Sequence, residues 1–444
     1  MTRILLLGIN FLLITSCIKQ EPKIIFSEII PVNTVGFNEK YAAYCKIDPY
    51  ENFEENAVLS SFVGAYSCSI EFAEKRDFSN GDIDLANGNK VFLEKLINDS
   101  LLSNNDEYLQ IAKLLEVINR PKNLDSLFTK LAHTDAKKLI TKRAEDFHFL
   151  LINEAHYCAQ HRLFTASLLK PLWEKGYRYL ALEALDNNFV DYELQKRGYP
   201  ILGTGYYIQE STFSNLVRKA LKIGYKLIPY ETKLDNDGTL RDKDQAQNIF
   251  NNTLKIDSVG KVLVHAGYDH IVEVGNMNYD PMGSQLKKIA AQEILTVEQR
   301  VMTGFSSAVK SHPYYKYVIE NYTFKDPIVF HNKDNEILVD PVHFVGGIDI
   351  QVYHPITKYF NNRPIWLLTK NKKVIMLPKE FNEFNGFLIQ AVKKGENNKA
   401  IPFDQFIVKT EKKSLFLENG EYELRLIDCE GTLVAKSGVN VRDK

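Results

Sequence analysis

Residues 147–153, with the sequence FHFLLIN, form the stretch that decides the fold of this chain. A short, mostly apolar run of this kind, followed at once by Glu154, predicts a strand that is buried on both faces of a sheet. Residues 163–175 continue with apolar side chains along one helical face, and Gly176 stands where a helix is expected to end. A buried strand followed by a helix of this length is typical of a parallel α/β fold.

The same order is repeated in the residues that follow. The pattern predicts strand 177–183, helix 213–223, strand 225–231, helix 245–256 and strand 262–265. Two of these strands begin after a glycine with a tyrosine and a basic residue, and both end in a glutamate. Pro229 in the second of them indicates an edge strand or a strand end. We therefore expect an α/β protein whose parallel-sheet core, flanked by helices, spans residues 141–350.

Titratable side chains stand at the carboxyl ends of the predicted strands, in the order Glu154, Glu183, Glu231 and His265. In parallel sheets these ends meet at one edge, where ligand groups gather. Charged groups at the ends of otherwise apolar strands are costly to bury without partners. The sequence therefore predicts a functional site at this edge, and the alternative is a polar cap on the sheet.

The pair Glu154 and His156 points to a particular chemistry. A single residue separates them, so both side chains can lie on one side of the strand exit. A carboxylate beside a histidine orients the ring and raises its basicity, which suits a general base that activates water. We expect Glu154, His156, Glu183 and His265 to be catalytic, and the same four are candidate ligands of a divalent metal ion.

Further side chains are expected to contribute to binding, namely His161, Arg162, Glu231, Arg241 and His270. His161 falls near the start of the helix that follows the first strand. Arg241 can clamp a substrate carboxylate or phosphate. The alternatives are that His270 is a solvated loop residue and that Glu231 pairs with a surface lysine.

The chain on either side of the α/β segment has a different pattern. Residues 18–35 are expected to be a linker, and residues 36–140 a mostly helical N-terminal region with an apolar helical face over 106–119. From residue 365 to residue 444, short strand-like pieces separated by turn residues predict a small antiparallel β-domain that resembles a sandwich. The pieces are 365–369, 373–377, 387–392, 405–408, 422–427 and 432–437.

Residues 1–17 have the features of a bacterial lipoprotein signal peptide. Arg3 supplies a positive charge, residues 4–14 are mostly apolar, and small residues precede Cys17. Residues 14–17 resemble a lipobox, which implies lipidation of Cys17 and a lipid-anchored membrane protein on the periplasmic or cell-surface side of the cell envelope. An ordinary signal peptide that is cut nearby is the alternative.

Composition narrows the classes of partner. A net charge of -1 gives no electrostatic footprint for nucleic acid. The cysteines after residue 17 are far apart and form no CxxC pair, so a cysteine zinc cluster is not expected. An exported chain can form a disulfide, and Cys45 and Cys68 are the nearest candidate pair.

The ordered motifs resemble a known superfamily, and they are Glu154-Ala155-His156, His161-Arg162, Leu182-Glu183-Ala184, Arg241-Asp242 and His265-Ala266-Gly267. Over roughly residues 140–310 their order and spacing are similar to those of the superfamily that contains erythromycin esterases, the haem-binding uptake protein ChaN and the TIKI proteases. The resemblance implies Glu and His groups that line a crevice at the strand ends. Asn153 replaces the usual glycine, and the interval from Glu154 to His156 matches the ChaN-type motif better than that of the esterases.

Three hypotheses follow from this resemblance. The first is a hydrolase that acts on an ester or amide of a small-molecule or peptide substrate, either without a cofactor, as in erythromycin esterases, or with a divalent metal, as in TIKI proteins. The second is a lipoprotein that binds haem or another iron-containing ligand, as ChaN does. The third is a cell-surface scaffold with a degenerate site.

Overall fold

The computed structural model describes residues 22–48, 52–77, 123–187, 190–232, 238–275, 279–304, 312–340, 347–409 and 414–443. The signal segment with Cys17 and the expected helix over 106–119 lie outside these residues. Within the described part of the chain, no helix combines the length and the apolar character needed to span a bilayer.

A parallel six-stranded sheet forms the centre of the molecule, with the strand order β10-β8-β4-β7-β5-β6. Its strands are β4 (Phe149–Glu154), β5 (Tyr177–Leu182), β6 (Lys226–Pro229), β7 (Lys261–Gly267), β8 (Leu295–Glu298) and β10 (Ile350–Gln351). The four strands expected from the sequence are present. The third of them, β6, is an edge strand that ends at Pro229, as its missing N–H requires.

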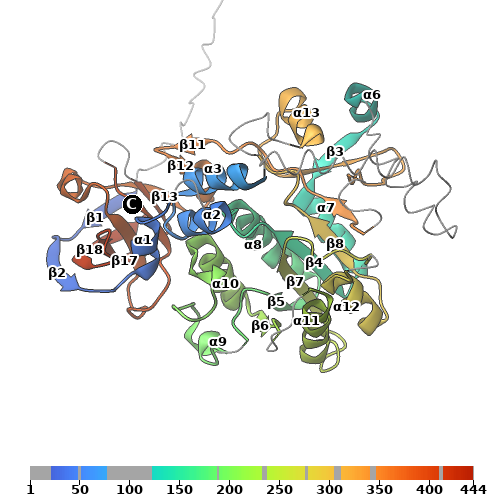
Figure 1. Ribbon diagram of the computed structural model, residues 1–444, viewed down its shortest axis with the longest axis horizontal. Helices are drawn as coiled ribbons and strands as arrows, with labels where there is room; N and C mark the ends of the chain where they lie inside the picture. The colour runs from blue at the N-terminus through green and yellow to red at the C-terminus, as the bar shows by residue number, and fades with distance from the viewer. Residues whose placement is uncertain are drawn as a thin grey trace, which may run out of the picture.

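Helices cover both faces of this sheet (Figure 1). One face packs against α7 (Ala136–Arg143), α8 (Ala159–Glu174) and α10 (Ser211–Ile223), and the other against α11 (Gly238–Asn252) and α12 (Met282–Ala290). The strands are accordingly apolar at successive positions, because alternate side chains enter opposite cores. Helix α11 begins seven residues earlier than the apolar pattern predicts.

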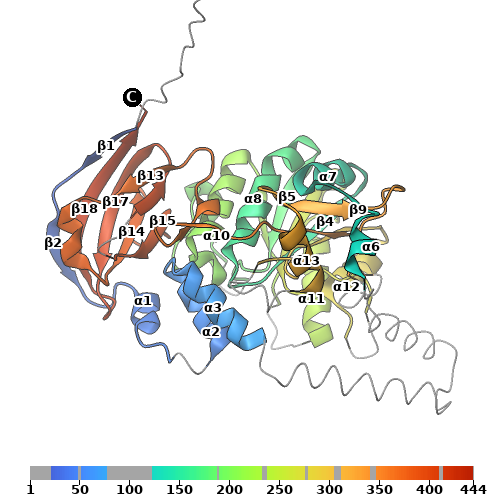
Figure 2. The ribbon, with the colours of Figure 1, turned by 90° about the horizontal axis from the view of Figure 1, so that it is seen from above.

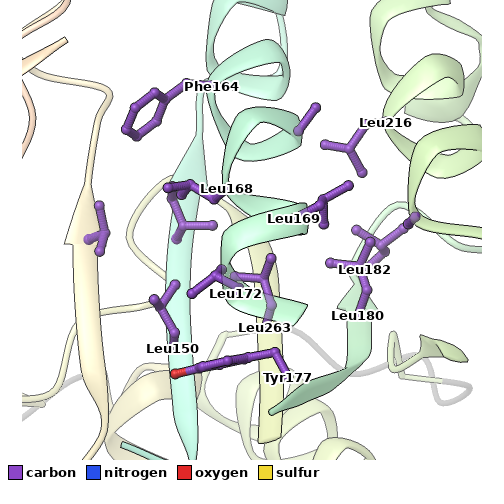
Figure 3. Packing of buried hydrophobic residues seen from close by; sticks show 14 of the residues in the cluster. Leu150, Phe164, Leu168, Leu169, Leu172, Tyr177, Leu180, Leu182, Leu216 and Leu263 are labelled. Atoms are coloured by element: carbon purple, nitrogen blue, oxygen red, sulfur yellow. The ribbon is translucent and has the colours of Figure 1, made fainter. Parts of the chain in front are cut away.

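The packing of α8 shows how the first core is built (Figure 3). Leu168, Leu169 and Leu172 from this helix are fully buried against Leu150 of β4 and Leu180 of β5. The next residue of β4, Leu151, is equally buried but belongs to the opposite core. Burial of a leucine side chain is worth about 1.5–3 kcal/mol, so this layer fixes the position of α8 on the sheet.

The connections that follow the two central strands, β4 and β7, run in opposite directions along the sheet. From β4 the chain crosses over β7 to reach β5 by way of α8, whereas from β7 it crosses over β4 to reach β8 by way of α12. The loops that leave β4 and β7 therefore separate toward opposite faces, which opens a crevice at the carboxyl ends of these strands in folds of this kind.

A second, antiparallel sheet is formed mostly by the C-terminal part of the chain, with the order β1-β18-β17-β14-β15 and β2 beside β18. Its C-terminal strands are β14 (Leu388–Lys393), β15 (Asp404–Ile407), β17 (Gly420–Ile427) and β18 (Leu433–Arg442), and the pair β13 (Lys373–Met376) and β16 (Ser414–Leu417) shares its apolar core. Figure 2 shows this β-domain beside the α/β domain.

Two expectations about the segments around the β-domain are wrong. The expected linker over 18–35 contains β1 (Lys23–Phe26) and β2 (Ile30–Thr34), which both pair with β18. The expected strand over 365–369 is instead a short 3-10 helix, Ile365–Leu367. For β1 and β2, pairing with a strand far away in the sequence decides the structure, and local patterning does not record it.

The N-terminal region supplies α1 (Glu39–Tyr44), α2 (Phe53–Phe62) and α3 (Tyr66–Asp77), and β3 (Ala132–Asp135) pairs with β9 (Ile328–His331). Helix α2 packs with Ala57 and Val58 against Ala155 and Tyr157, in the loop that follows β4. Helices α2 and α3 therefore lie over the carboxyl end of β4.

The disulfide bond also differs from the expected one. Cys45, at the end of α1, is bonded to Cys429 of the β-domain across 384 residues of sequence. Cys68 and Cys158 are free. The sequence interval made Cys45 and Cys68 the nearest pair, but the fold brings the end of α1 to the turn between β17 and β18.

Candidate functional site

A buried ion pair anchors the site at the end of β4. Glu154 is 1% exposed and accepts hydrogen bonds from Arg162 Nε at 2.7 Å and from Arg162 Nη2 at 2.8 Å. Burial alone would raise the pKa of Glu154, but the Arg162 guanidinium outweighs this effect and holds the pKa well below its usual range. Glu154 is therefore a carboxylate, and Arg162 fixes its orientation from α8.

His156 lies on the open side of this carboxylate. Its Nδ1 is 3.1 Å from Glu154 Oε1, and its side chain is 12% exposed. Because an ionised carboxylate only accepts hydrogen bonds, Nδ1 carries a proton toward Glu154, and in the neutral ring the lone pair is on Nε2. The ring is stacked on Tyr207 at 3.9 Å between centroids and meets Tyr268 edge-on at 5.0 Å.

Gly267, at the end of β7, makes room for the His156 ring. In the register of the sheet Gly267 lies opposite Glu154. A Cβ atom at this position would stand 2.3 Å from His156 Cε1, 2.5 Å from His156 Nε2 and 3.2 Å from Glu183 Oε2. The imidazole Nε2 and the Glu183 carboxylate therefore converge on the same face of Gly267, and no larger residue fits between them.

Glu183 joins this group from the end of β5. Its Oε2 accepts a hydrogen bond from the Gly267 N–H, and its Oε1 accepts one from Arg241 Nη2 at 2.9 Å. Burial acts to raise the pKa of Glu183, but the positive charges of His270 and Arg241 and the ring of His156 together lower it. Glu183 is thus a second carboxylate of the site.

Arg241 connects Glu183 to the outer part of the site. Its Nε donates to Glu231 Oε1 at 3.1 Å, Gln245 donates to both oxygens of Glu231, and the Arg241 side chain is 31% exposed. Glu231 therefore pairs with a residue of the site, and the alternative of a surface lysine is wrong. The exposed part of the guanidinium is available to an anionic or developing negative charge.

His270 belongs to the same network. Its Nδ1 lies 2.8 Å from Asp242 Oδ1, and its Nε2 lies 3.7 Å from Glu183 Oε1. Burial opposes protonation, but the hydrogen bond to Asp242 and the charge of Glu183 raise the pKa of His270. His270 is consequently held among carboxylates and is not a solvated loop residue.

His265 is buried next to Glu154. It lies opposite Ile152 in the register of β4 and β7, and its Nε2 is 3.5 Å from Glu154 Oε2 without a hydrogen-bond partner among the described residues. Burial lowers the pKa of His265 to about 4, which the charge of Glu154 only partly offsets. His265 is neutral at pH 7 and packs against Phe213.

His161 lies in the first turn of α8, as expected, but its contacts are with the protein itself. Its Nδ1 accepts a hydrogen bond from the Ala155 N–H at 3.1 Å, and its Nε2 lies 2.8 Å from Thr303 Oγ1. Burial holds the pKa of His161 well below its usual value. Both ring nitrogens are occupied by the protein itself, so His161 fixes the loop after β4 and is not available to a ligand.

Two important contributors were missed by the sequence analysis. Glu210 is fully buried at the start of α10, where it accepts hydrogen bonds from the backbone of Thr212 and Phe213, from Tyr66 Oη at 2.6 Å and from Arg162 Nη1 at 3.3 Å. Tyr207 stands in the short helix before it. An acidic residue a few positions before the predicted helix 213–223 was the available signal for Glu210, because such residues cap helix N-termini. Tyr207 had no comparable signal.

The contacts of Glu154 decide whether the candidate metal ligands could hold a cation. Both carboxylate oxygens of Glu154 are engaged by a guanidinium, which occupies the approach that a cation would need. Among the described residues, no group of three or more His, Cys, Asp or Glu side chains is arranged to hold a metal ion. The surroundings of Glu154 fit a proton-transfer site and do not fit a metal site.

Comparison with known proteins gives only distant likenesses. No family model and no curated protein sequence matches the chain. The type III effector HopBA1 aligns at 12% identity with a TM-score of 0.28, covering 40% of this chain and 90% of its own. ChaN of Campylobacter jejuni, solved with cofacially bound haem, aligns at 12% identity with a TM-score of 0.29, covering 49% and 91%. RRSP, a MARTX toxin effector domain from Vibrio vulnificus CMCP6, aligns at 12% identity with a TM-score of 0.27, covering 61% and 64%.

Proposed function

We propose that this chain is a hydrolase that cleaves an ester or amide bond, with His156 as its general base. The observation that carries the proposal is the pair of contacts around His156. Its Nδ1 is held 3.1 Å from a buried carboxylate, and its Nε2 faces Gly267 beside Glu183. An imidazole oriented in this way by a carboxylate is the arrangement that general base catalysis requires.

The proton transfers follow from the tautomer. His156 Nε2 accepts a proton from a water molecule, whose oxygen attacks the carbonyl carbon of the substrate. Glu154 remains ionised and stabilises the imidazolium that forms, since Arg162 keeps its pKa low. When the tetrahedral intermediate collapses, the bond to the leaving group breaks and the leaving oxygen or nitrogen takes the proton from Nε2.

In this proposal Arg241 stabilises the negative charge that develops on the substrate oxygen. Its guanidinium is partly exposed beside Glu183, so it is the cation of the site that a substrate oxyanion can reach. Glu183 and Glu231 hold it in place from two strand ends. Preorganised positive charge at the developing oxyanion is a large contribution to hydrolytic catalysis.

The test is a His156→Gln variant assayed against p-nitrophenyl esters and a peptide library. We expect a loss of kcat of about 100-fold or more with an unchanged Tm, because Gln keeps a hydrogen bond to Glu154 but cannot accept the proton. His133→Gln, an exposed histidine on β3, is the matched control and should keep full activity. Turnover that survives in His156→Gln, or a wild-type chain that hydrolyses none of these substrates, would contradict the proposal.

One observation favours haem binding as a second candidate. Tyr268 adopts a positive φ of 44°, and its ring lies edge-to-face with the ring of His156 at 5.0 Å between centroids. Tyrosine and histidine are common axial ligands of haem iron. Titration with haemin should then produce a Soret band that Tyr268→Phe weakens, whereas a metal-free hydrolase gives no saturable band.

Anchoring at the membrane is part of the proposed function. The lipobox-like residues 14–17 support a lipid on Cys17. Cells that express the chain with Cys17→Ser should show it in the soluble envelope fraction and without incorporated radioactive palmitate. Labelling that persists in this variant would argue against Cys17 as the lipidation site.

A further inference from the structure

A cavity separate from the site of Glu154 and His156 lies where three parts of the chain meet. Its volume is 410 Å³, within the range of about 300–1,000 Å³ that is typical of small-molecule sites. Residues 36–40, at and before the start of α1, form one wall, Leu202 and Gln209 a second, and the β-domain the third. Ile201 pairs with Ala400 of the β-domain, and Figure 2 shows α1 next to the β-domain.

The lining of the cavity includes Lys40, whose ammonium group contacts aromatic rings. Lys40 Nζ lies over the ring of Tyr206 at 4.2 Å and over that of Phe62 at 5.6 Å. In the part of the chain that the structure describes, no carboxylate forms an ion pair with it. Burial lowers the pKa of Lys40, although Glu39 and Glu55 oppose this effect. A bound anion would compensate for the water that the ammonium group has lost.

Arg425 adds a second positive charge to the lining. Its Nε donates to Glu423 Oε1 at 2.7 Å, and its Nη1 donates to the Asn398 carbonyl at 2.9 Å. Its Nη2 has no hydrogen bond within the described residues, although the side chain is almost buried. The guanidinium therefore retains donors for a ligand in the cavity, whose lining otherwise includes one acidic residue, Glu39.

Neutral polar groups and aromatic rings complete the lining. Gln390 donates to Gln405 Oε1 at 2.8 Å, and Gln405 donates in turn to the carbonyl of Phe62, so Gln390 Oε1 is left as an acceptor. Gln209 contributes a further amide, and Phe37 and Phe62 contribute apolar ring surface. Amides that bond hydroxyl groups beside aromatic rings that cover C–H surface suit a sugar ring.

We propose that this cavity binds a small polyhydroxylated carboxylate, such as a uronic acid, with its carboxylate on Lys40 and Arg425 and its hydroxyls on Gln209 and Gln390. The two cations select the acid, and the amides and rings select the sugar. Because none of these residues belongs to the network of His156, binding does not depend on the proposed hydrolysis.

The experiment is calorimetric titration of the chain, expressed without residues 1–17 and under non-reducing conditions, with sodium D-glucuronate, D-glucose and sodium acetate. We expect saturable binding of glucuronate and at least tenfold weaker binding of glucose and acetate. Lys40→Gln should weaken glucuronate binding at least tenfold, whereas Lys46→Gln, which changes an exposed lysine near the end of α1, should leave it within twofold.

A second variant keeps the test decisive if Lys40→Gln unfolds. Gln390→Leu removes the open acceptor while it preserves the size of the side chain, and it should also weaken glucuronate binding. Equal binding of acetate and glucuronate would show an anion site without sugar recognition and would overturn the proposal. It would also be overturned by glucuronate binding that is unaffected in both variants, or by no saturable binding at millimolar concentration.

Discussion

Gly267 is the residue at which the site tolerates least change. The His156 ring occupies the space that a Cβ atom would need, at 2.3 Å from its Cε1. We expect Gly267→Ala to lower the free energy of unfolding by about 1–3 kcal/mol and to abolish activity, because the imidazole is forced away from Glu154. Urea unfolding and the esterase assay measure the two effects.

A double-mutant cycle isolates the cause of that loss. In a His156→Ala background the two contacts of the added methyl group with the imidazole are removed, and Glu183 Oε2 remains at 3.2 Å. The destabilisation by Gly267→Ala should therefore be smaller there by about 1 kcal/mol or more. An equal destabilisation in both backgrounds would mean that the backbone of β7, and not the His156 ring, excludes alanine.

Buried neutral histidines make stability depend on pH. Burial lowers the pKa of His265 to about 4 and that of His354 to about 3, so the unfolded chain takes up protons that the folded chain refuses. The two histidines contribute their full stabilisation of the folded state above about pH 6.5, and this stabilisation is lost as the pH falls toward 4. The raised pKa of His270 acts in the opposite direction.

The expected result is a free energy of unfolding that falls between pH 6.5 and pH 4, by up to about 3 kcal/mol for His265 alone. Urea unfolding at pH 7.0, 5.5 and 4.5 measures this dependence. His354→Gln should flatten the profile, since glutamine does not titrate and can still bond Gln299. A profile that is equally steep in this variant would remove His354 from the explanation.

At the scale of elements, α10 connects the N-terminal helices to the site. Glu210 caps this helix and at the same time bonds Arg162 and the Tyr66 hydroxyl at the start of α3. We expect Glu210→Ala to cost about 3 kcal/mol or more, because a helix cap is lost and the charge of a buried arginine is left partly uncompensated.

A milder substitution separates the two roles of Glu210. Tyr66→Phe removes a single hydrogen bond and should cost about 1 kcal/mol, with the cap of α10 intact. Thermal unfolding of both variants gives the comparison. A cost for Tyr66→Phe as large as that for Glu210→Ala would mean that the contact with α3, and not the cap, stabilises α10.

The elements that could be predicted from the sequence are those long enough to show a recognisable pattern of apolar residues. β4, β5 and β7 are buried over most of their length, so their sequences are mostly apolar and their polar ends mark the site. β8 and β10 have only four and two residues, too few for a pattern to be seen. Glu210 and Tyr207 lie between recognisable elements, so only the folded chain shows that they support Arg162 and His156.

At the scale of the whole molecule, the disulfide Cys45–Cys429 joins α1 to the β-domain. A link that closes so long a loop restricts the unfolded chain, by an amount on the order of 5 kcal/mol in the chain-entropy description. The double variant Cys45→Ser, Cys429→Ser should therefore show a clearly lower Tm under oxidising conditions. Cys68→Ser, at a free and half-buried cysteine, is the control and should change Tm little; equal Tm values for the two variants would contradict this account.

The pairing of β1 and β2 with β18 has a consequence for biosynthesis. Residues 23–34 are synthesised long before their strand partners, residues 433–442. The β-domain therefore cannot be completed until β18 has been synthesised, and its first two strands must wait unpaired while the α/β domain is made between them. A truncation that removes β18 would leave β1 and β2 without partners and would also expose an edge of β17. Unpaired strand edges of this kind promote aggregation.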